Sequence, residues 1–269
     1  MKTKLLSHTQ LSEEFYDSFD VYNEFIEIEG NELDRLGATD GQAVALSAVR
    51  CCYSANKPSE IVAKEGNRYF GNKATDGGKG TEADRLMRHI ITSKHTSTLE
   101  HITFTFAIEG VSRALLAQLT RHRVGFSFSV QSQRYVRMGS TDKIGGFDYV
   151  VPENIKNSSK TVEYDPADGD HVTALDVFEH AMSELQWQYD KLRELGIPAE
   201  DARSILPNAA TTNLVMTVNL RSLLDFYAKR RKGNGAQAEI AELAEHLRKE
   251  VVKVEPWVDE FFESYGGGK

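Results

Sequence analysis

The sequence is poor in several features that define large classes of protein. Its 269 residues include only two cysteines, Cys51 and Cys52, and because these are adjacent they exclude a disulfide framework and favour a reducing compartment. No hydrophobic run approaches the roughly 18 apolar residues of a membrane span, and residues 1–15 contain no apolar signal core. We therefore expect a cytoplasmic protein with no membrane partner.

Basic charge is also scarce. Aspartate and glutamate number 40 against 32 lysines and arginines, so the net charge is −8. This balance argues against a protein that coats nucleic acid, and any phosphate site must be local. The sequence lacks the Walker A loop, the glycine-rich dinucleotide fingerprint and the nucleophile elbow, so phosphate must be held in another way.

The hydrophobic periodicity predicts a mixed α+β fold. Apolar residues alternate, as in half-buried strands, over 101–110, 126–131, 146–152 and 213–219, with Gly110 ending the first of these. They recur at helical spacing over 40–54, 82–95, 111–123, 172–195, 199–206, 221–231 and 236–254. Thr39 or Asp40 and Thr81 are expected to cap the first two helices. Two polar stretches, 64–81 and 157–171, are expected to be surface loops of one domain rather than linkers.

Positive charge is concentrated in the stretch RHRVGFSFSVQSQRYVR at 121–137. Arg121, Arg123, Arg134 and Arg137 repel one another there unless anions neutralise them. The planar guanidinium group forms bidentate bonds with phosphate oxygens, which favours a small ligand with several negative charges. Surface ion pairs with the many carboxylates are the alternative.

Several residues could carry other chemistry. His122 lies between two arginines, which disfavour an imidazolium, so we expect a neutral, hydrogen-bonding histidine. His95, Glu100 and His101 fit no familiar zinc spacing, so no metal site is predicted, and His95 and Glu100 could simply cap the following strand. Ser132 has no neighbouring histidine or lysine to activate it, which favours hydrogen bonding to a ligand over nucleophilic attack. The two cysteines fall in an apolar helical pattern, which favours buried, unreactive thiols.

The segment RHRVGFSFSVQSQRY resembles the signature of flavin-dependent thymidylate synthases. It is accompanied in the family's order by HTSTLEHITFTF and GVSRALLAQLTRHR upstream and by ARSILP, TVNLRSLLDF and AQAEI downstream, which together cover about residues 40–255. The resemblance implies a single α+β domain over 1–269, with a small antiparallel sheet flanked by helices. It also implies a homotetramer in which several chains build each active site.

The activity implied by this resemblance is the reductive methylation of dUMP to dTMP in de novo dTMP synthesis. Methylenetetrahydrofolate would donate the carbon, bound FAD the hydride, and NADPH would reduce the flavin again. No cysteine nucleophile is needed in this chemistry, in agreement with the expectation for Cys51 and Cys52.

The resemblance also implies roles for individual residues. The flavin side comprises Ser97, Glu100, Arg121, His122, Arg123, Asn219, Arg221 and Asp225, with His95 near the flavin and the folate. The positions that match dUMP contacts are Gln118, Arg121, Ser132, Gln133, Arg134, Arg203 and Arg230. Arg230 is implied to be catalytic, because a fixed cation stabilises negative charge that develops on the pyrimidine. Ser132 is implied to orient and polarise the uracil.

The sequence departs from the family pattern at four places. The gap between RHR and the serine at 132 is one residue longer than usual, which predicts a bulge at 124–126. Ser129 stands where asparagine is common, and Asp225 stands where an amide is common. The segment after the catalytic position is one residue longer, so Arg231 is an alternative to Arg230.

Two alternatives to this activity remain. Stretch 121–137 interleaves arginines with aromatic residues, as RNA-binding modules do, although the acidic balance and the ordered downstream motifs argue against this. A flavoprotein that binds FAD or dUMP without transferring a methyl group is the alternative among enzymes.

Overall fold

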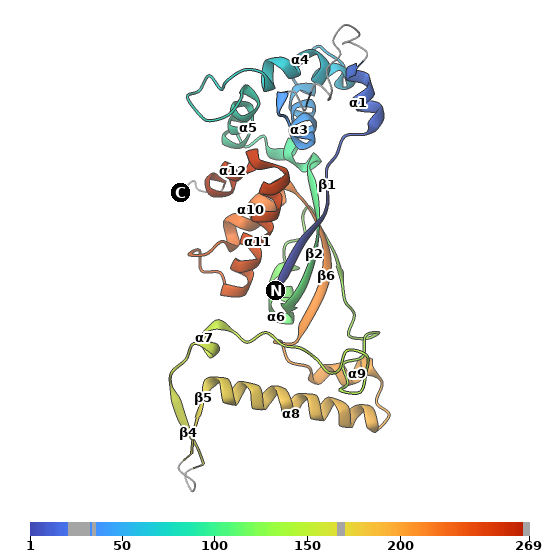
Figure 1. Cartoon of the computed structure of the whole chain (residues 1–269), viewed down its shortest axis with the longest axis vertical. Helices are drawn as coiled ribbons and strands as arrows, with labels where there is room; N and C mark the ends of the chain where they lie inside the picture. The colour runs from blue at the N-terminus through green and yellow to red at the C-terminus, as the bar shows by residue number, and fades with distance from the viewer. Residues whose placement is uncertain (21–32, 34–35, 166–169, 266–269) are drawn as a thin grey trace.

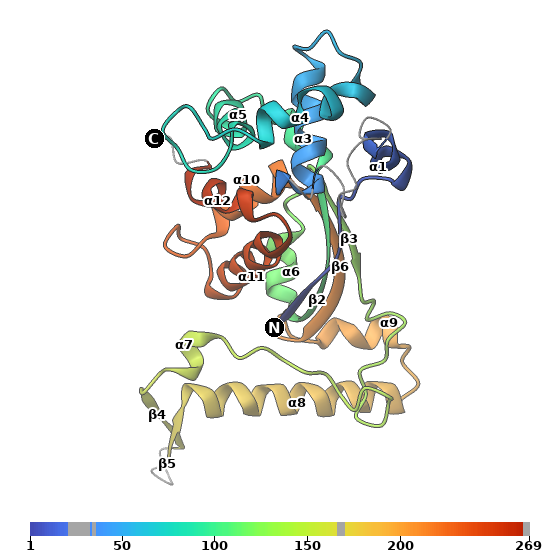
Figure 2. The same ribbon diagram turned by 45° about the horizontal axis from the view of Figure 1, so that its top comes forward.

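The structure is a computed structural model that describes residues 1–20, 33, 36–165 and 170–265. Its main sheet is antiparallel with the strand order β1–β2–β6–β3, shown in Figures 1 and 2. The strands are β1 (Lys2–His8), β2 (Thr103–Ser112), β6 (Thr211–Asn219) and β3 (Phe126–Val130). The expected mixture of helices with a small antiparallel sheet is confirmed.

Alternation along β2 and β6 explains why the sheet has one apolar face. Phe104 lies opposite Val218 and Phe106 lies opposite Met216, and all four side chains are fully buried. The period of two sends the intervening residues to the other face, which is more polar. β2 continues past Gly110, contrary to the prediction that this glycine ends the strand. The register shifts between Ile108 and Val111, and Gly110 has a φ of +68°, so the glycine accommodates a bulge.

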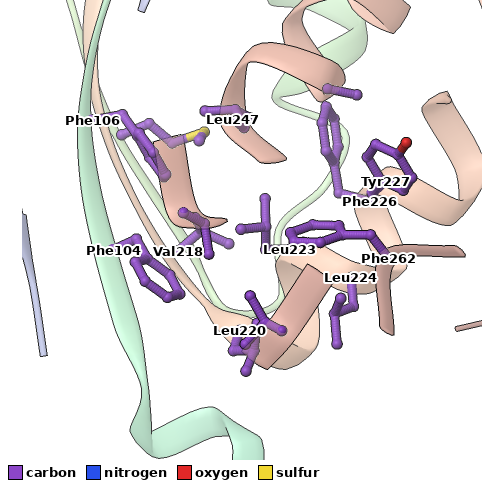
Figure 3. Packing of buried hydrophobic residues seen from close by; sticks show 14 of the residues in the cluster. Phe104, Phe106, Val218, Leu220, Leu223, Leu224, Phe226, Tyr227, Leu247 and Phe262 are labelled. Atoms are coloured by element: carbon purple, nitrogen blue, oxygen red, sulfur yellow. The ribbon is translucent and has the colours of Figure 1, made fainter. Parts of the chain in front are cut away.

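Four helices cover the apolar face of the sheet. They are α6 (Arg113–Leu119), α10 (Leu220–Arg230), α11 (Ala238–Val254) and α12 (Asp259–Ser264), the last reached through the 3₁₀ turn η4 (Pro256–Val258). Figure 3 shows Phe104 and Phe106 of β2 facing Leu223 of α10 and Leu247 of α11. Each such buried side chain stabilises the fold by about 1.5–3 kcal/mol. This core fixes α10, which carries several of the predicted site residues.

A helical cluster stands at one end of the sheet (Figure 1). It contains α1 (Glu13–Asp20), α3 (Asp40–Cys51), η1 (Pro58–Glu60), α4 (Ile61–Phe70), α5 (Glu82–Thr92) and η2 (Thr96–His101). Thr39 and Thr81 form capping boxes at the starts of α3 and α5, as predicted. The expected loop at 64–81 is only partly correct, because its first seven residues complete α4. Cys51 and Cys52 are both exposed at the end of α3, so the prediction that they are buried is wrong.

The segment between β3 and β6 lies beyond the other end of the sheet, where α8 crosses below it (Figures 1 and 2). It contains α7 (Glu153–Lys156), β4 (Thr161–Asp165), β5 (Asp170–Thr173), α8 (Ala174–Glu194), α9 (Ala199–Ala202) and η3 (Arg203–Ile205). β4 and β5 pair as a hairpin within the stretch 157–171 that we expected to be a loop. The predicted strand at 146–152 is reduced to one bridge between Tyr149 and Ala210. Among the described residues, no helix is long and apolar enough to cross a membrane.

Candidate active site

The RHR residues lie in the turn between α6 and β3, because α6 ends at Leu119 instead of continuing to residue 123 as predicted. Gly125 closes this turn with a φ of +72°. A Cβ atom on Gly125 would lie 2.2 Å from Ser222 Oγ, and the amide N–H of Asn219 donates to the Gly125 carbonyl at 3.1 Å. The turn therefore packs directly on the start of α10, which requires glycine at this position. Residues 124 and 125, where the sequence predicted a bulge, lie in this turn before β3 begins, and the Val124 side chain is 84% exposed.

His122 and Arg230 meet beside this turn. The Nε–H of Arg230 donates to Nε2 of His122 at 3.1 Å, which joins the RHR turn to the last turn of α10. Burial, followed by the charge of Arg230, holds the pKa of His122 below its ordinary value of 6.5. His122 is therefore a neutral hydrogen-bonding histidine, as the sequence predicted.

Arg231 points to a different part of the molecule. Its guanidinium forms an ion pair with the Glu263 carboxylate of α12 at 3.0 Å. Arg230 makes no ion pair with a carboxylate in the part of the chain that the structure describes. Of the two arginines left open by the sequence, Arg230 is the one that lies with the RHR residues.

Other residues predicted for the flavin side gather at the same end of the sheet. Asn219 caps α10 by accepting a hydrogen bond from Ser222 N–H at 2.9 Å. Arg221 forms an ion pair with Glu100 of η2, and Asp225 forms one with Lys229 at 2.6 Å. Ser97 is exposed on the same 3₁₀ segment as Glu100, and His95, also exposed, immediately precedes that segment. We call this set the RHR cluster: His95, Ser97, Glu100, Arg121, His122, Arg123, Asn219, Arg221, Asp225 and Arg230.

A second group of predicted residues lies near the opposite end of β3. Arg134 forms an ion pair with Glu200 at 2.5 Å, and Arg203 donates to the backbone carbonyl of Glu200 at 3.0 Å. Ser132 Oγ accepts a hydrogen bond from the Arg134 amide at 3.2 Å. Gln133 is only 6% exposed, and its buried Nε2 donor has no hydrogen-bond partner. We call Ser132, Gln133, Arg134 and Arg203 the Arg134 group.

The structure does not bring these two sets into one pocket within a single chain. The five residues of β3 lie between them. At about 3.4 Å per residue, the two sets are separated by about 15 Å. Gln118, another predicted nucleotide contact, lies near the end of α6, one turn before Arg121, where its Nε2 donates to Gln237 Oε1 at 2.5 Å.

Arg113 is a candidate that the sequence analysis missed. It begins α6 near Arg203, and burial together with repulsion from Arg203 holds its pKa below the ordinary value. No carboxylate forms an ion pair with Arg113 in the described ranges. An arginine at the start of a helix has no distinctive sequence pattern. Its position within GVSRALLAQLTRHR, one of the segments that carry the resemblance, could have indicated it.

The unpaired arginines favour an anionic ligand. Arg50, Arg85, Arg88 and Arg248 all form ion pairs with carboxylates. By contrast, Arg121, Arg123 and Arg137 form none with the residues that the structure describes, so surface ion pairing does not account for them. The described residues also contain no group of three or more histidine, cysteine, aspartate or glutamate side chains that could hold a metal ion.

Comparison with known proteins identifies a matching family and similar sequences. The family described as "Thymidylate synthase complementing protein" matches residues 36–257. The flavin-dependent thymidylate synthase of Geobacter sulfurreducens is 36% identical over 219 residues, which cover 81% of each chain. That of Clostridium tetani is 34% identical over 231 residues, covering 80% of this chain and 79% of the relative.

Two solved structures share the fold. The UMP/dUMP methylase PolB from Streptomyces cacaoi, bound with 5-Br dUMP, has a TM-score of 0.63 at 21% identity and covers 98% of this chain and 95% of its own. ThyX from Helicobacter pylori, complexed with FAD and dUMP, has a TM-score of 0.59 at 23% identity and covers 98% and 99%. With its sequence relatives, its matched motifs and this fold, the chain belongs to the family of flavin-dependent thymidylate synthases.

Proposed function

We propose that this chain is a cytoplasmic enzyme that methylates dUMP to dTMP, with methylenetetrahydrofolate as carbon donor and NADPH as reductant through bound FAD. The observation that carries this proposal is the placement of Arg230. Its Nε is held by His122, and no carboxylate neutralises its guanidinium among the described residues. A fixed, unpaired cation of this kind stabilises negative charge that develops on a pyrimidine ring.

The residues of the RHR cluster fit a flavin dinucleotide. Arg121 and Arg123 are exposed and unpaired within the described structure, so they can neutralise a diphosphate with bidentate hydrogen bonds. Asn219, Arg221 and Glu100 add amide, guanidinium and carboxylate groups at the same end of the sheet. Bound FAD supplies the hydride that the methylation requires, and these side chains hold and orient it.

The Arg134 group fits a nucleoside monophosphate. Arg134 and Arg203 supply positive charge, and Ser132 supplies a hydroxyl that can orient the uracil. The buried Nε2 of Gln133 lacks an acceptor, and a buried donor left unpaired costs about 1–3 kcal/mol. A nucleotide oxygen would satisfy it.

The separation of the two sets along β3 supports an active site that several chains share. In a homotetramer, the RHR cluster of one copy would meet the Arg134 group of another. Each chain then contributes arginines to a site that it cannot complete alone.

The proposal is tested by measuring dTMP directly. Purified protein with FAD, dUMP, methylenetetrahydrofolate and NADPH is expected to form dTMP, and omission of any one should abolish it. UMP replaces dUMP as a substrate control. Arg230→Ala is expected to lower kcat by about 10²- to 10³-fold, the loss typical of one electrostatic stabiliser. Arg231→Ala is the matched control and should retain turnover. Flavin reduction without any dTMP would favour the flavoprotein without methyl transfer.

A further inference from the structure

The imidazole of His122 is a fixed hydrogen-bond acceptor for the long, flexible side chain of Arg230. Its imidazole packs edge-on against Phe226, with ring centroids 4.9 Å apart and an interplanar angle of 80°. The ring centroid of Phe126 lies 5.9 Å from that of His122. The His122 backbone N–H also donates to the Leu119 carbonyl at 3.0 Å. Phe226 itself is fully buried, so the ring is held by the core rather than by solvent-exposed residues.

Arg230 takes its orientation from this acceptor. Of the five N–H donors of a guanidinium, the Nε–H is the one bonded to His122 Nε2. In the described part of the chain, the two Nη groups of Arg230 make no hydrogen bond or ion pair with protein. They remain available to a ligand, while the Nε side is fixed to the protein.

This contact exists in only one protonation state of His122. Nε2 can accept a hydrogen bond only when it carries no proton, which assigns the neutral imidazole with its proton on Nδ1. Protonation would turn Nε2 into a donor facing another donor. Arg230 and Lys229 of α10, together with Arg121, oppose the imidazolium, and burial opposes it most strongly. Asp225 favours it, but this carboxylate is paired with Lys229.

We propose that His122 is a positioning residue whose neutral imidazole fixes Arg230 for the reaction, and that protonation of His122 releases Arg230 and slows turnover. The identity of the substrate in this inference rests on the proposed function. The link between His122 protonation and Arg230 does not, and it can be measured without any substrate.

The first test is NMR of the full-length protein with ¹³C- and ¹⁵N-labelled histidine, with and without FAD. The His122 resonances are assigned by their loss in His122→Gln. We expect the tautomer protonated on Nδ1, a midpoint below 6.5, and a higher midpoint in Arg230→Met, which removes the opposing cation. A proton on Nε2 at pH 8, or a midpoint that Arg230→Met leaves unchanged, would overturn the inference.

The second test compares the pH dependence of kcat at saturating dUMP. Wild-type kcat should fall as the pH drops below about 6.5. His122→Gln keeps an acceptor that cannot be protonated, so its acid-side decline should disappear. His122→Leu lacks the acceptor and should lower kcat by about 10- to 100-fold relative to the glutamine variant, with a smaller change in KM.

Retained FAD is measured for every variant, so that a lost flavin contact is not mistaken for a displaced arginine. Equal kcat values for the glutamine and leucine variants, or an unchanged acid-side decline in the glutamine variant, would overturn the inference. If the wild-type protein forms no dTMP, the proposed function fails, and the NMR titration alone decides whether His122 controls Arg230.

Discussion

The guanidinium of Arg134 and the carboxylate of Glu200 form an ion pair, with Nε and Oε2 2.5 Å apart and both side chains about half exposed. Exposed pairs of this kind contribute at most about 1 kcal/mol, so a phosphate with greater charge can displace the carboxylate. If Arg134 binds the nucleotide phosphate, as proposed, Glu200 competes with the nucleotide for Arg134.

Glu200→Gln should accordingly tighten dUMP binding by about two- to fivefold, the range that such a weak pair allows. Arg203 should be unaffected, because it bonds to the Glu200 backbone carbonyl. Isothermal titration calorimetry of the FAD-loaded protein measures the affinity. Glu194→Gln, which removes a pair with Lys191 on α8, is the matched control. Weaker binding in Glu200→Gln would show that the carboxylate supports the site.

A site shared between chains predicts complementation. Arg134→Ala and Arg230→Ala remove residues from different sets at opposite ends of β3, so each variant on its own should be nearly inactive. Co-expression of the two variants should restore part of the turnover, because some sites combine an intact Arg134 group with an intact RHR cluster from another copy. Co-expression of Arg121→Ala with Arg230→Ala, both in the RHR cluster, is the control mixture, and it should stay inactive. Absence of recovery in the first mixture would mean that a single chain supplies both sets to each active site.

Gly125→Ala should destabilise the RHR turn for two reasons. A positive φ costs an alanine about 1–2 kcal/mol, and its Cβ would also collide with Ser222 and Asn219. Gly235 has nearly the same φ, +73°, with no atom within 4 Å of an added Cβ, so Gly235→Ala isolates the backbone contribution. We expect a larger fall in Tm and a greater loss of bound FAD for Gly125→Ala. Equal effects of the two variants would exclude a role for the close packing.

We expect the stability of the fold to depend on pH through the buried carboxyl group of Glu255. This buried carboxylate accepts hydrogen bonds from Gly41 N–H at 3.1 Å and Trp257 Nε1–H at 2.5 Å, and also from Thr39. Burial nevertheless raises its pKa above the ordinary 4.5. The raised pKa means that protonation of Glu255 favours the folded state. This stabilisation is fully present below the ordinary pKa of 4.5 and is lost as the pH rises through the raised pKa of the folded protein.

Glu255→Gln does not titrate and leaves at least one donor poorly paired. It should lower the free energy of unfolding by about 1–3 kcal/mol near pH 5, and this deficit should shrink as the pH rises. Urea unfolding at several pH values measures it. A deficit that stays constant from pH 5 to pH 8 would mean that Glu255 is already ionised in the folded protein throughout that range.

The sequence predicted those elements whose local pattern agrees with their burial. β2 alternates from Thr103 to Ile108 and β6 along its length, and Thr39 and Thr81 have the glutamine or aspartate three residues later that completes a capping box. β1 was missed because its segment KTKLLSH alternates poorly, and it forms by pairing with residues about a hundred positions away. Cys51 and Cys52 were misassigned because a helical stripe does not reveal where its last turn leaves the core.

The sequence predicted which residues form the candidate site better than it predicted where they lie. The arginine motif marked the RHR cluster, but α6 ends four residues earlier than its apolar spacing suggested, which moves the motif into a turn. Neighbouring helical positions differ by about 100° in direction, so sequence alone could not choose between Arg230 and Arg231. Tertiary contacts with His122 and Glu263 make that distinction.

The proposed function requires FAD and dUMP to bind next to one another on this protein. Visible absorption spectra test it most directly: the protein is mixed with FAD, excess flavin is removed, and dUMP is added. We expect flavin bands that remain with the protein and shift when dUMP binds. A colourless protein that retains no FAD and does not respond to dUMP would contradict it and favour the RNA-binding alternative.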